Sequence, residues 1–381
     1  MKTLQVISYF SPKFGGDVKV CTDLSRELAK RKHAVTIITT DFGFDAQHAD
    51  IIRAEGISVI PFPCVAQISN FFYSPSMKKW LERNLKDFDV IHLHNHRTYQ
   101  NNEVHKFAMK YGIPYIVQAY GSVLPIFQKQ NLKKLYDFIW GDKILLDASK
   151  LIAVSKVERA QYLKMGVPES KIEIVPQGFD VSQYQTLPER GKFRRKYGIA
   201  ADEKMVLYLG RLHKSKGLDF LISGFSSLLD MNKDVKLVIA GPDEGFLDTL
   251  MRQIEKLEID EKVLFTGFIN EKFEAFVDAD VLVYAGVLEI FGLVPFEAIM
   301  CGTPVIVADD CGCGEVIKQG KCGYVVKYGN INDLKEKMTV SLNNPELNAQ
   351  MVENGRKFIR DYLTWERVTT DIEKCYRQVI R

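Results

Sequence analysis

Short apolar runs alternate with amphipathic segments along most of the chain. Apolar runs of strand length occupy residues 4–9, 34–39 and 90–94 in the first half, and 205–209 and 235–240 in the second. The segments between them repeat apolar side chains at helical spacing. Strands and helices that alternate in this way build parallel sheets with helices on both faces. The pattern therefore predicts an α/β protein made of repeated βα units.

Length and a break in the pattern divide the chain into parts. A chain of 381 residues with 46% hydrophobic content suits two domains, each with a core of its own. The chain becomes polar and irregular at residues 182–196, which indicates a hinge. We expect an N-terminal domain at residues 1–184, a C-terminal domain at residues 185–361 and a final helical segment at residues 362–381.

Charge and cysteine usage exclude several classes of protein. The net charge of +3 is too small for a nucleic-acid binder, whose basic excess should dominate a domain. Seven cysteines without paired spacing, and no recognisable signal peptide, predict a cytoplasmic protein. No apolar run approaches the roughly 20 residues that cross a bilayer, so any membrane contact is expected to be peripheral.

The stretch after the apolar run 281–284 carries the most specific chemistry. A buried strand, a turn containing Gly292 and a helix with Pro295 near its first turn present backbone N–H groups to an anion. Two carboxylates, Glu289 and Glu297, flank these amides. We expect Glu297 about two turns into the helix, where a carboxylate can accept hydrogen bonds from vicinal hydroxyls. Phosphate with vicinal hydroxyls indicates a nucleotide.

These residues resemble a known family. Glu289 and Glu297, with seven residues between them, resemble the Glu-x7-Glu signature of retaining glycosyltransferases of the GT-B fold, family 4 or group 1. The segment Phe291-Gly292-Leu293 and the run 301–307 resemble the turn, helix and next strand of that family. The resemblance implies two facing, doubly wound, Rossmann-like domains with an interdomain cleft, and a final helix that crosses back to the first domain.

The resemblance also implies a diphosphate site after the strand 205–209. Gly210, Arg211 and Lys216 match the family's Gly-Arg-Leu…Lys-Gly motif. A leaving nucleoside diphosphate gains charge as the glycosidic bond breaks, and fixed cations stabilise it. Arg binds phosphate through two donors, and Lys acts as a point charge. The resemblance gives Arg211, Lys216 and Glu289 catalytic roles.

Further family roles fall on the C-terminal domain. The amides of Phe291, Gly292 and Leu293 would assist the two cations, and Gly210 belongs to the same donor site. Glu297 would hold the ribose, and Glu289 would orient the hydroxyls of the donor sugar. No cofactor and no bound metal are required, because the nucleotide sugar is itself the donor substrate.

The resemblance assigns Gly15 and Gly16 to donor binding, and Tyr120, Gly121 and His94 to the acceptor or the cleft. Gly15 and Gly16 follow the first strand, where paired glycines allow a ligand close to the backbone; a simple tight turn is the alternative. Tyr120 precedes Gly121 where the family commonly has His-Gly. A phenol stays neutral near pH 7, so this difference questions any contact centred on a histidine.

Three histidines, His92, His94 and His96, would share one face of a strand. Three imidazoles could bind zinc, but no nearby carboxylate or cysteine completes a site. We interpret them as a polar rim of the cleft, with His94 on the acceptor side, because the family has a similar His-x-His stretch there.

Residues 127–150 mix lysines with aromatic and aliphatic side chains, Phe127 and Trp140 among them. A basic amphipathic helix of this composition can lie on an anionic membrane, which would suit a lipid-linked acceptor. The alternative is a helix packed on the core with a solvated lysine face. The same two interpretations apply to residues 78–86.

The predicted function is transfer of a hexose-type sugar from a UDP- or GDP-sugar to an acceptor hydroxyl, with retention. Glycan, lipid-linked and small-molecule acceptors stay open, within polysaccharide, lipopolysaccharide or other glycoconjugate synthesis. A sugar-nucleotide epimerase of the same fold and a non-catalytic sugar-nucleotide-binding module are the alternatives. A glycoside hydrolase also uses paired carboxylates but has no use for a phosphate-binding turn beside two cations.

Overall fold

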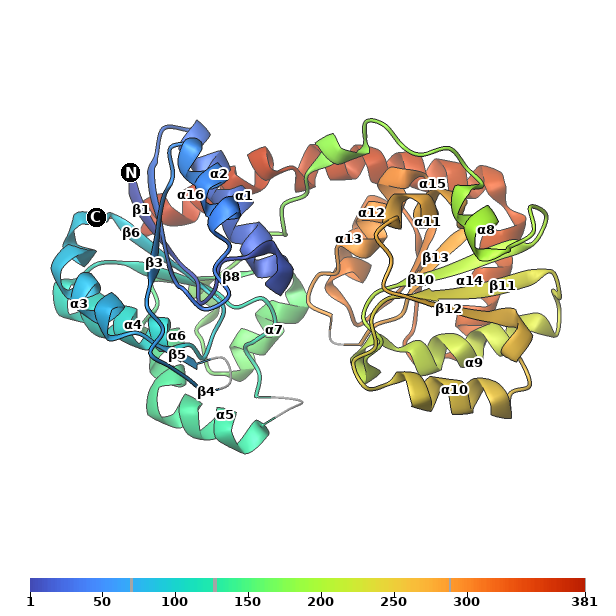
Figure 1. The fold of residues 1–381 in the computed structure, drawn as a ribbon, viewed down its shortest axis with the longest axis horizontal. Coiled ribbons are helices and arrows are strands. Elements are labelled where there is room, and N and C mark those ends of the chain that lie inside the picture. Colours follow the sequence, from blue (N-terminus) through green and yellow to red (C-terminus); the bar gives the residue numbers. More distant parts are fainter. Residues whose placement is uncertain (69–70, 126–128, 288, 381) are drawn as a thin grey trace. The chain divides into compact units, whose positions relative to one another are not determined.

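A computed structural model describes residues 1–68, 71–125, 129–287 and 289–380 (Figure 1). Residue contacts divide the chain into two compact units, Met1–Gly178 with Leu363–Arg381, and Phe179–Tyr362. The division at Gly178 lies a few residues before the polar segment 182–196 that the sequence suggested as a hinge. None of the helices within the described ranges combines the length and the apolar character that a membrane span requires.

The first unit is built on a seven-stranded parallel sheet. Its strand order is β3-β2-β1-β6-β7-β8-β9. The bounds are β1 (Lys2–Val6), β2 (Ala34–Thr40), β3 (Ser58–Phe62), β6 (Val90–His94), β7 (Tyr115–Gln118), β8 (Lys150–Ala153) and β9 (Ile172–Ile174). The order reverses between β1 and β6, and open α/β sheets bind ligands at such a switch point.

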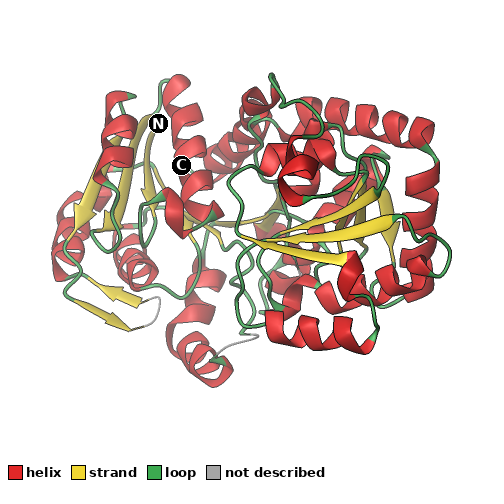
Figure 2. Cartoon of the chain, turned by 45° about the vertical axis from the view of Figure 1, so that its right-hand side comes forward, coloured by secondary structure: helices red, strands yellow, loops and turns green. Residues whose placement is uncertain are grey.

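Helices cover both faces of this sheet, and a short hairpin stands beside it (Figure 2). The helices are α1 (Gly16–Lys30), α2 (Ala46–Ala54), α3 (Pro75–Asn84), α4 (Tyr99–Tyr111), α5 (Gln130–Tyr136), α6 (Asp142–Asp147), α7 (Lys156–Lys164) and α16 (Trp365–Val379). A π-helical turn, Asp137–Gly141, joins α5 to α6. The hairpin pairs β4 (Ala66–Ile68) with β5 (Phe71–Tyr73).

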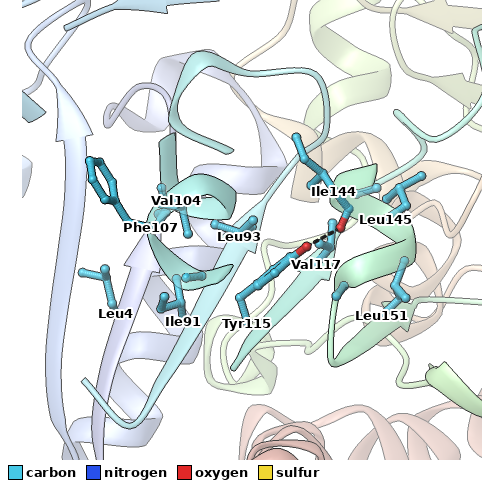
Figure 3. Close-up of a cluster of buried hydrophobic side chains, with 14 of the residues drawn as sticks. Leu4, Ile91, Leu93, Val104, Phe107, Tyr115, Val117, Ile144, Leu145 and Leu151 are labelled. Carbon is cyan, nitrogen blue, oxygen red and sulfur yellow. Dashed lines mark hydrogen bonds between the residues drawn. The ribbon is translucent and has the colours of Figure 1, made fainter. Parts of the chain in front are cut away.

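Consecutive strand residues supply two separate cores, because side chains alternate between the faces of a strand. Ile91 and Val117 belong to the core that α3, α4 and α6 cover. Figure 3 shows this core, in which the Tyr115 hydroxyl donates to the Ile144 carbonyl oxygen at 2.7 Å. Val90 and Ile116 belong to the opposite core. Strands buried on both faces explain the continuous apolar runs of the sequence.

The last helix completes the second of these cores. Helix α16 begins after Thr364, whose hydroxyl accepts from the Arg367 amide. It buries Val368, Ile372 and Tyr376, at helical spacing, in the core that also holds residues of α1 and α2. The end of the chain therefore belongs to the unit formed by its beginning.

The second unit is a six-stranded parallel sheet of order β12-β11-β10-β13-β14-β15. The strands are β10 (Lys204–Leu209), β11 (Val235–Ala240), β12 (Val263–Gly267), β13 (Val281–Tyr284), β14 (Val305–Ala308) and β15 (Tyr324–Val326). The helices are α8 (Lys192–Tyr197), α9 (Leu218–Leu229), α10 (Leu247–Lys256), α11 (Lys272–Asp278), α12 (Val294–Cys301), α13 (Gly312–Gly320), α14 (Ile331–Asn343) and α15 (Pro345–Phe358). Its switch point lies between β10 and β13.

Candidate functional site

Two loops meet at the switch point of the second sheet. After β10 the chain forms a 3-10 turn, Lys214–Lys216, and after β13 it continues through Ala285. The Val287 amide donates to the Ser215 carbonyl oxygen at 2.9 Å. Gly217 has φ +64°, and a Cβ at this position would overlap the carbonyl oxygen of Ala285. Only glycine therefore lets the two loops come this close.

The meeting of these loops joins Lys216 to Glu289. The Lys216 ammonium forms an ion pair with the Glu289 carboxylate, and the Tyr284 hydroxyl donates to the same carboxylate at 2.9 Å. Only 15% of the Lys216 side chain and 17% of the Glu289 side chain are exposed. Burial, and then the charge of Glu289, raise the pKa of Tyr284 well above its usual value, so this hydroxyl keeps its proton. The ion pair thus has a fixed, neutral hydrogen-bond donor beside it.

The turn before α12 lies against this ion pair. Gly292 has φ +76°, and a Cβ there would lie 3.0 Å from the Tyr284 ring and 3.2 Å from Glu289 Cγ. The Phe291 ring stacks on Phe296 with centroids 5.3 Å apart, which fixes the turn. Among the residues that the structure describes, none accepts a hydrogen bond from the amides of residues 291–293. Unpaired N–H groups at the start of a helix attract an anion.

Glu297 lies nearer the helix start than the sequence suggested. Helix α12 begins at Val294, so Glu297 is in its first turn, and the expected position about two turns in is wrong. Its carboxylate accepts from the Lys272 ammonium at 2.8 Å. The Tyr184 hydroxyl lies close to it, and burial followed by the Glu297 charge raises the pKa of Tyr184. Glu297 is thus held by a cation and has a phenol beside it.

A pocket opens at the ends of β10, β11 and β12. Its volume is about 410 Å³, within the range of small-molecule sites. Gly210, Arg211, Gly241, Phe268 and Lys272 are among its lining residues. Since Lys272 also binds the Glu297 carboxylate, the pocket and Glu297 share one cation.

Arg211 has a partner that the sequence did not predict. Its Nη1 donates to both Glu244 carboxylate oxygens at 2.7 and 2.8 Å, and 59% of the side chain is exposed. The Tyr208 hydroxyl donates to the Arg211 carbonyl oxygen. Burial and then the charge of Glu289 raise the pKa of Tyr208, and the charges of Arg211 and Glu244 also act on it. Tyr208, near the end of β10, therefore lies close to both ion pairs.

In the first unit the loops after β1 and β6 also meet at the switch point. Gly15 precedes α1, which begins at Gly16. Asp17 of this helix accepts from the Tyr9 hydroxyl at 2.8 Å and from the Asn95 side-chain amide at 2.6 Å. Asp17 was not predicted from the sequence, although an acidic residue directly after paired glycines was a visible signal.

His94 lies inside the unit and not at a polar rim. It is 1% exposed, and its ring nitrogens bond to the Tyr120 hydroxyl at 2.7 Å and to Gln5 Oε1 at 2.9 Å. A carbonyl oxygen such as Gln5 Oε1 only accepts, so His94 Nε2 carries the proton and Tyr120 donates to Nδ1. The predicted rim position is wrong, because a strand buried on both faces leaves no polar side. Tyr120, at φ +51°, has its hydroxyl proton committed to His94.

The same network continues to the last helix. The Gln5 amide nitrogen donates to the Tyr376 hydroxyl at 3.3 Å, and His92 Nδ1 bonds that hydroxyl at 2.8 Å. The His92 and His94 rings stack with centroids 4.5 Å apart. Burial lowers the pKa of His92 to about 3 and holds that of His94 well below its usual value. Both rings are neutral at physiological pH.

Gly121 rests on a buried carboxylate. Its amide donates to Glu158 at 2.7 Å, and the Val154 amide donates to the other oxygen at 2.9 Å. Burial raises the pKa of Glu158 to about 7, although both amide bonds act to lower it. Glu158 therefore fixes the turn that follows Tyr120.

His96, the third of the histidines, is also buried and lies 3.7 Å from Asp137. No group of three or more potential ligands in the described part of the chain could hold a metal.

The fold and these sites correspond to known proteins. The model for "Glycosyl transferases group 1" matches residues 189–358, and that for "Glycosyltransferase Family 4" matches residues 14–183. Two doubly wound parallel sheets, one in each unit, are those of the GT-B fold. The chain belongs to the group 1, family 4 glycosyltransferases.

The chain is similar to relatives and to solved structures over almost its whole length. An uncharacterized glycosyltransferase of Methanocaldococcus jannaschii is 26% identical over 99% of this chain and 98% of its own. The N-acetyl-alpha-D-glucosaminyl L-malate synthase of Bacillus anthracis is 24% identical over 97% and 96%. The structure of HepE from Anabaena, solved with UDP, has a TM-score of 0.79 at 19% identity and covers 99% of this chain and 100% of its own.

Proposed function

We propose that this glycosyltransferase moves a hexose from a UDP- or GDP-sugar to an acceptor hydroxyl, with retention at the anomeric carbon. The observation that carries the proposal is the meeting of Lys216, Glu289 and the 291–293 turn at one switch point. HepE, which has the same fold, was solved with UDP and with UDP-glucose, and this supports a nucleotide sugar as donor.

The diphosphate is bound by an exchange of partners. Lys216 and Arg211 each hold a carboxylate, Glu289 and Glu244. A diphosphate carries more charge than either carboxylate, so it replaces them and leaves Glu289 free. The backbone amides of residues 291–293 add donors without a further charge. Charge that develops on the leaving phosphate is then met by groups already in place.

The nucleoside occupies the pocket at the ends of β10 to β12. Glu297 accepts from the ribose hydroxyls while its bond from Lys272 holds the carboxylate in place. The base lies along Gly210 and Gly241, whose small size leaves room beside the strand ends. A pocket of about 410 Å³ accommodates a nucleoside.

Glu289, once released from Lys216, orients the hydroxyls of the donor sugar. In the transfer, the bond from the anomeric carbon to the diphosphate oxygen breaks and a bond to the acceptor oxygen forms on the same face. The acceptor proton passes to the departing phosphate oxygen, so no protein nucleophile is needed.

The first unit contributes the acceptor side of the proposal. The turn at Tyr120 and Gly121 follows the carboxyl end of β7. His94 acts as a positioning residue, since it fixes the Tyr120 hydroxyl as a group that can only accept from a substrate hydroxyl. The acceptor is a glycan, a lipid-linked glycan or a small molecule that is used in glycoconjugate synthesis.

Incubation with a panel of UDP- and GDP-sugars, with and without simple alcohol acceptors, tests the proposal. The proposal is supported if nucleoside diphosphate is released and the product linkage has the same anomeric configuration as the donor. An isomerised donor sugar would indicate an epimerase, and tight binding without turnover would indicate a binding module. Either of these two results contradicts the proposal.

A further inference from the structure

One surface of the first unit exposes large apolar side chains. Helix α5 and the π-helical turn carry five of them: Leu132, Leu135, Phe138, Ile139 and Trp140. Phe138 is 82% exposed, which is far more than a core-packing helix leaves open. The interpretation of this segment as a helix packed on the core is therefore wrong for its outer side. Phe127, part of the predicted segment, lies outside the described residues.

The π-helical turn that follows α5 is held firmly from its other side. Asp137 is buried and receives two hydrogen bonds of 2.7 Å from Arg97. Gly141 is buried beside it, and a Cβ there would lie 2.5 Å from Asp137 Oδ1. Ile144 and Leu145 continue into the core. The π-turn thus anchors one side of the segment while the opposite side stays in solvent, so the apolar surface is a fixed feature.

The surface extends to the hairpin β4–β5 through a row of aromatic contacts. Phe71 lies with its ring centroid 5.6 Å from Tyr99 and 6.5 Å from Tyr136. Tyr136 lies 5.6 Å from Trp140. Ile68 of the hairpin is 74% exposed. Figure 1 shows α5 beside β4 and β5. The hairpin and the helix therefore form one apolar face, defined by Ile68, Tyr73, Leu132, Leu135, Phe138, Ile139 and Trp140.

The charges around this apolar face indicate what covers it. Within residues 129–143 the exposed charged side chains are all lysines, Lys129, Lys134 and Lys143. Of the two acidic residues in that range, Asp137 is buried and paired with Arg97, and Asp142 is half-buried. Protein interfaces are depleted in lysine, whereas lysines that flank apolar and aromatic groups extend to the phosphates of a lipid surface.

We propose that this apolar face, with its three lysines, docks the protein on an anionic lipid bilayer. Phe138 and Trp140 enter the boundary between headgroups and acyl chains, and the lysines contact anionic headgroups. The contact is peripheral and lies in the first unit, whereas the donor residues belong to the second. It does not depend on the proposed sugar transfer, because no donor takes part in it.

Co-sedimentation with vesicles tests this proposal in the full chain. We expect binding to vesicles of phosphatidylcholine mixed with phosphatidylglycerol, and much weaker binding to phosphatidylcholine alone. K134Q/K143Q should lower the partition onto the anionic vesicles about 25-fold, about fivefold for each lysine. The control K256Q/K357Q removes the same charge from exposed sites in the second unit and should leave the partition unchanged.

Two further variants separate a lipid contact from a contact between protein chains. F138S/W140S should abolish binding to the vesicles, and M231S, which removes another largely exposed apolar side chain, from the second unit, should not. W140F should keep binding but lose the blue shift of tryptophan emission that vesicles induce. Equal sedimentation of F138S/W140S and the natural protein would overturn the proposal. So would a dimer in solution that F138S/W140S dissociates, since a second copy would then cover the face.

Discussion

Lys216 and Glu289 are 73 positions apart in the chain, yet they are joined as the central ion pair of the second unit. In the free protein the two charges neutralise each other, and both side chains are mostly buried. In the proposed function a diphosphate separates the pair and gives each group a different task. The pair would then be a preformed site that a donor opens.

Replacing Lys216 tests this at the residue scale. K216A should lower the rate of nucleoside diphosphate release about 10²- to 10³-fold, the usual effect of removing one donor to a developing charge. K214A is the matched control, because Lys214 lies in the same 3-10 turn and is exposed. Initial rates at saturating donor give the comparison. Equal rates for the two variants would contradict the proposed role of Lys216.

The buried histidines make stability depend on pH. His92 is neutral in the folded protein down to about pH 3, whereas in the unfolded chain it titrates near 6.5. Below about pH 6.5 the unfolded chain binds a proton that the folded protein does not, so acidification destabilises the fold. The free energy of unfolding should fall by about 1.4 kcal/mol per pH unit for each such proton.

The variant H92N isolates this contribution. Asn can present a hydrogen-bonding group near the position of Nδ1, so the bond with the Tyr376 hydroxyl is kept while the titration is removed. Urea unfolding at about pH 7.5 and about pH 5 should show a smaller loss of stability for H92N than for the natural protein. His94 and His96 retain part of the slope, because burial lowers their pKa values too. An identical loss of stability between the two pH values in both proteins would contradict a contribution from His92.

The sequence could predict which residues carry chemistry but not all of their partners. Glu289 and Lys216 were expected from their motifs, whereas Glu244, Lys272 and Tyr284 were not. These partners lie on other elements, and only the packing of the sheet brings them near. His94 was misplaced for a related reason: a strand covered on both faces has no polar side from which its direction can be inferred.

At the scale of elements, glycines set how closely the loops of the second unit approach. Gly217 lies against Ala285, and Gly241 has a Cβ position that would overlap the carbonyl oxygen of Gly210. Gly241 directly follows β11, and Gly217 lies between the 3-10 turn and α9. Parallel strands and helices were predicted correctly from the apolar pattern, but the closeness of these loops depends on contacts between distant segments.

Gly217 and Gly245 give a matched pair for a test. Both have positive φ, but nothing lies within 4 Å of a Cβ at Gly245. G245A should therefore cost only the backbone term, about 1 kcal/mol, whereas G217A should cost about 2–4 kcal/mol because it also forces the loops apart. Urea unfolding measures both. G217A should also lose the thermal shift produced by UDP or GDP, and a normal shift would contradict the role of the close contact.

Helix boundaries show a second limit of the sequence. Glu297 was expected further along α12 than it lies, because Gly292 and Pro295 allow more than one starting residue. The choice is made by Leu293, whose carbonyl oxygen accepts from the Phe296 and Glu297 amides. A shift of this size leaves the fold unchanged but moves a carboxylate to the first turn, where the helix dipole favours its charge.

At the scale of the whole molecule, each unit has its own buried apolar residues, and the last helix packs in the first unit. Length and the polar break predicted two domains and a final helical segment, and the resemblance implied the return of that segment to the first domain. The buried face of α16 was readable from its spacing. The hydrogen bonds that Tyr376 makes to β1 and β6 could not be read from the sequence, because they join residues more than 280 positions apart.

A reciprocal pair of core variants tests the separateness of the units. I372A empties a site in the core under α16, and L334A empties one in α14. Each should cost about 2–5 kcal/mol locally. Hydrogen exchange followed by mass spectrometry should show faster exchange in β1 and β2 for I372A, and in strands of the second unit for L334A. Faster exchange throughout the chain for both variants would contradict independent cores.

The return of α16 also fixes an order of events during synthesis. The ribosome releases the strands of the first unit early, but the residues that cover one of their faces are made last. The second unit, whose segment is continuous, can close its sheet while that face still lacks its covering. The part of the protein that is made first is thus the part that is finished last, and nascent chains stopped before residue 363 should present that uncovered face to chaperones.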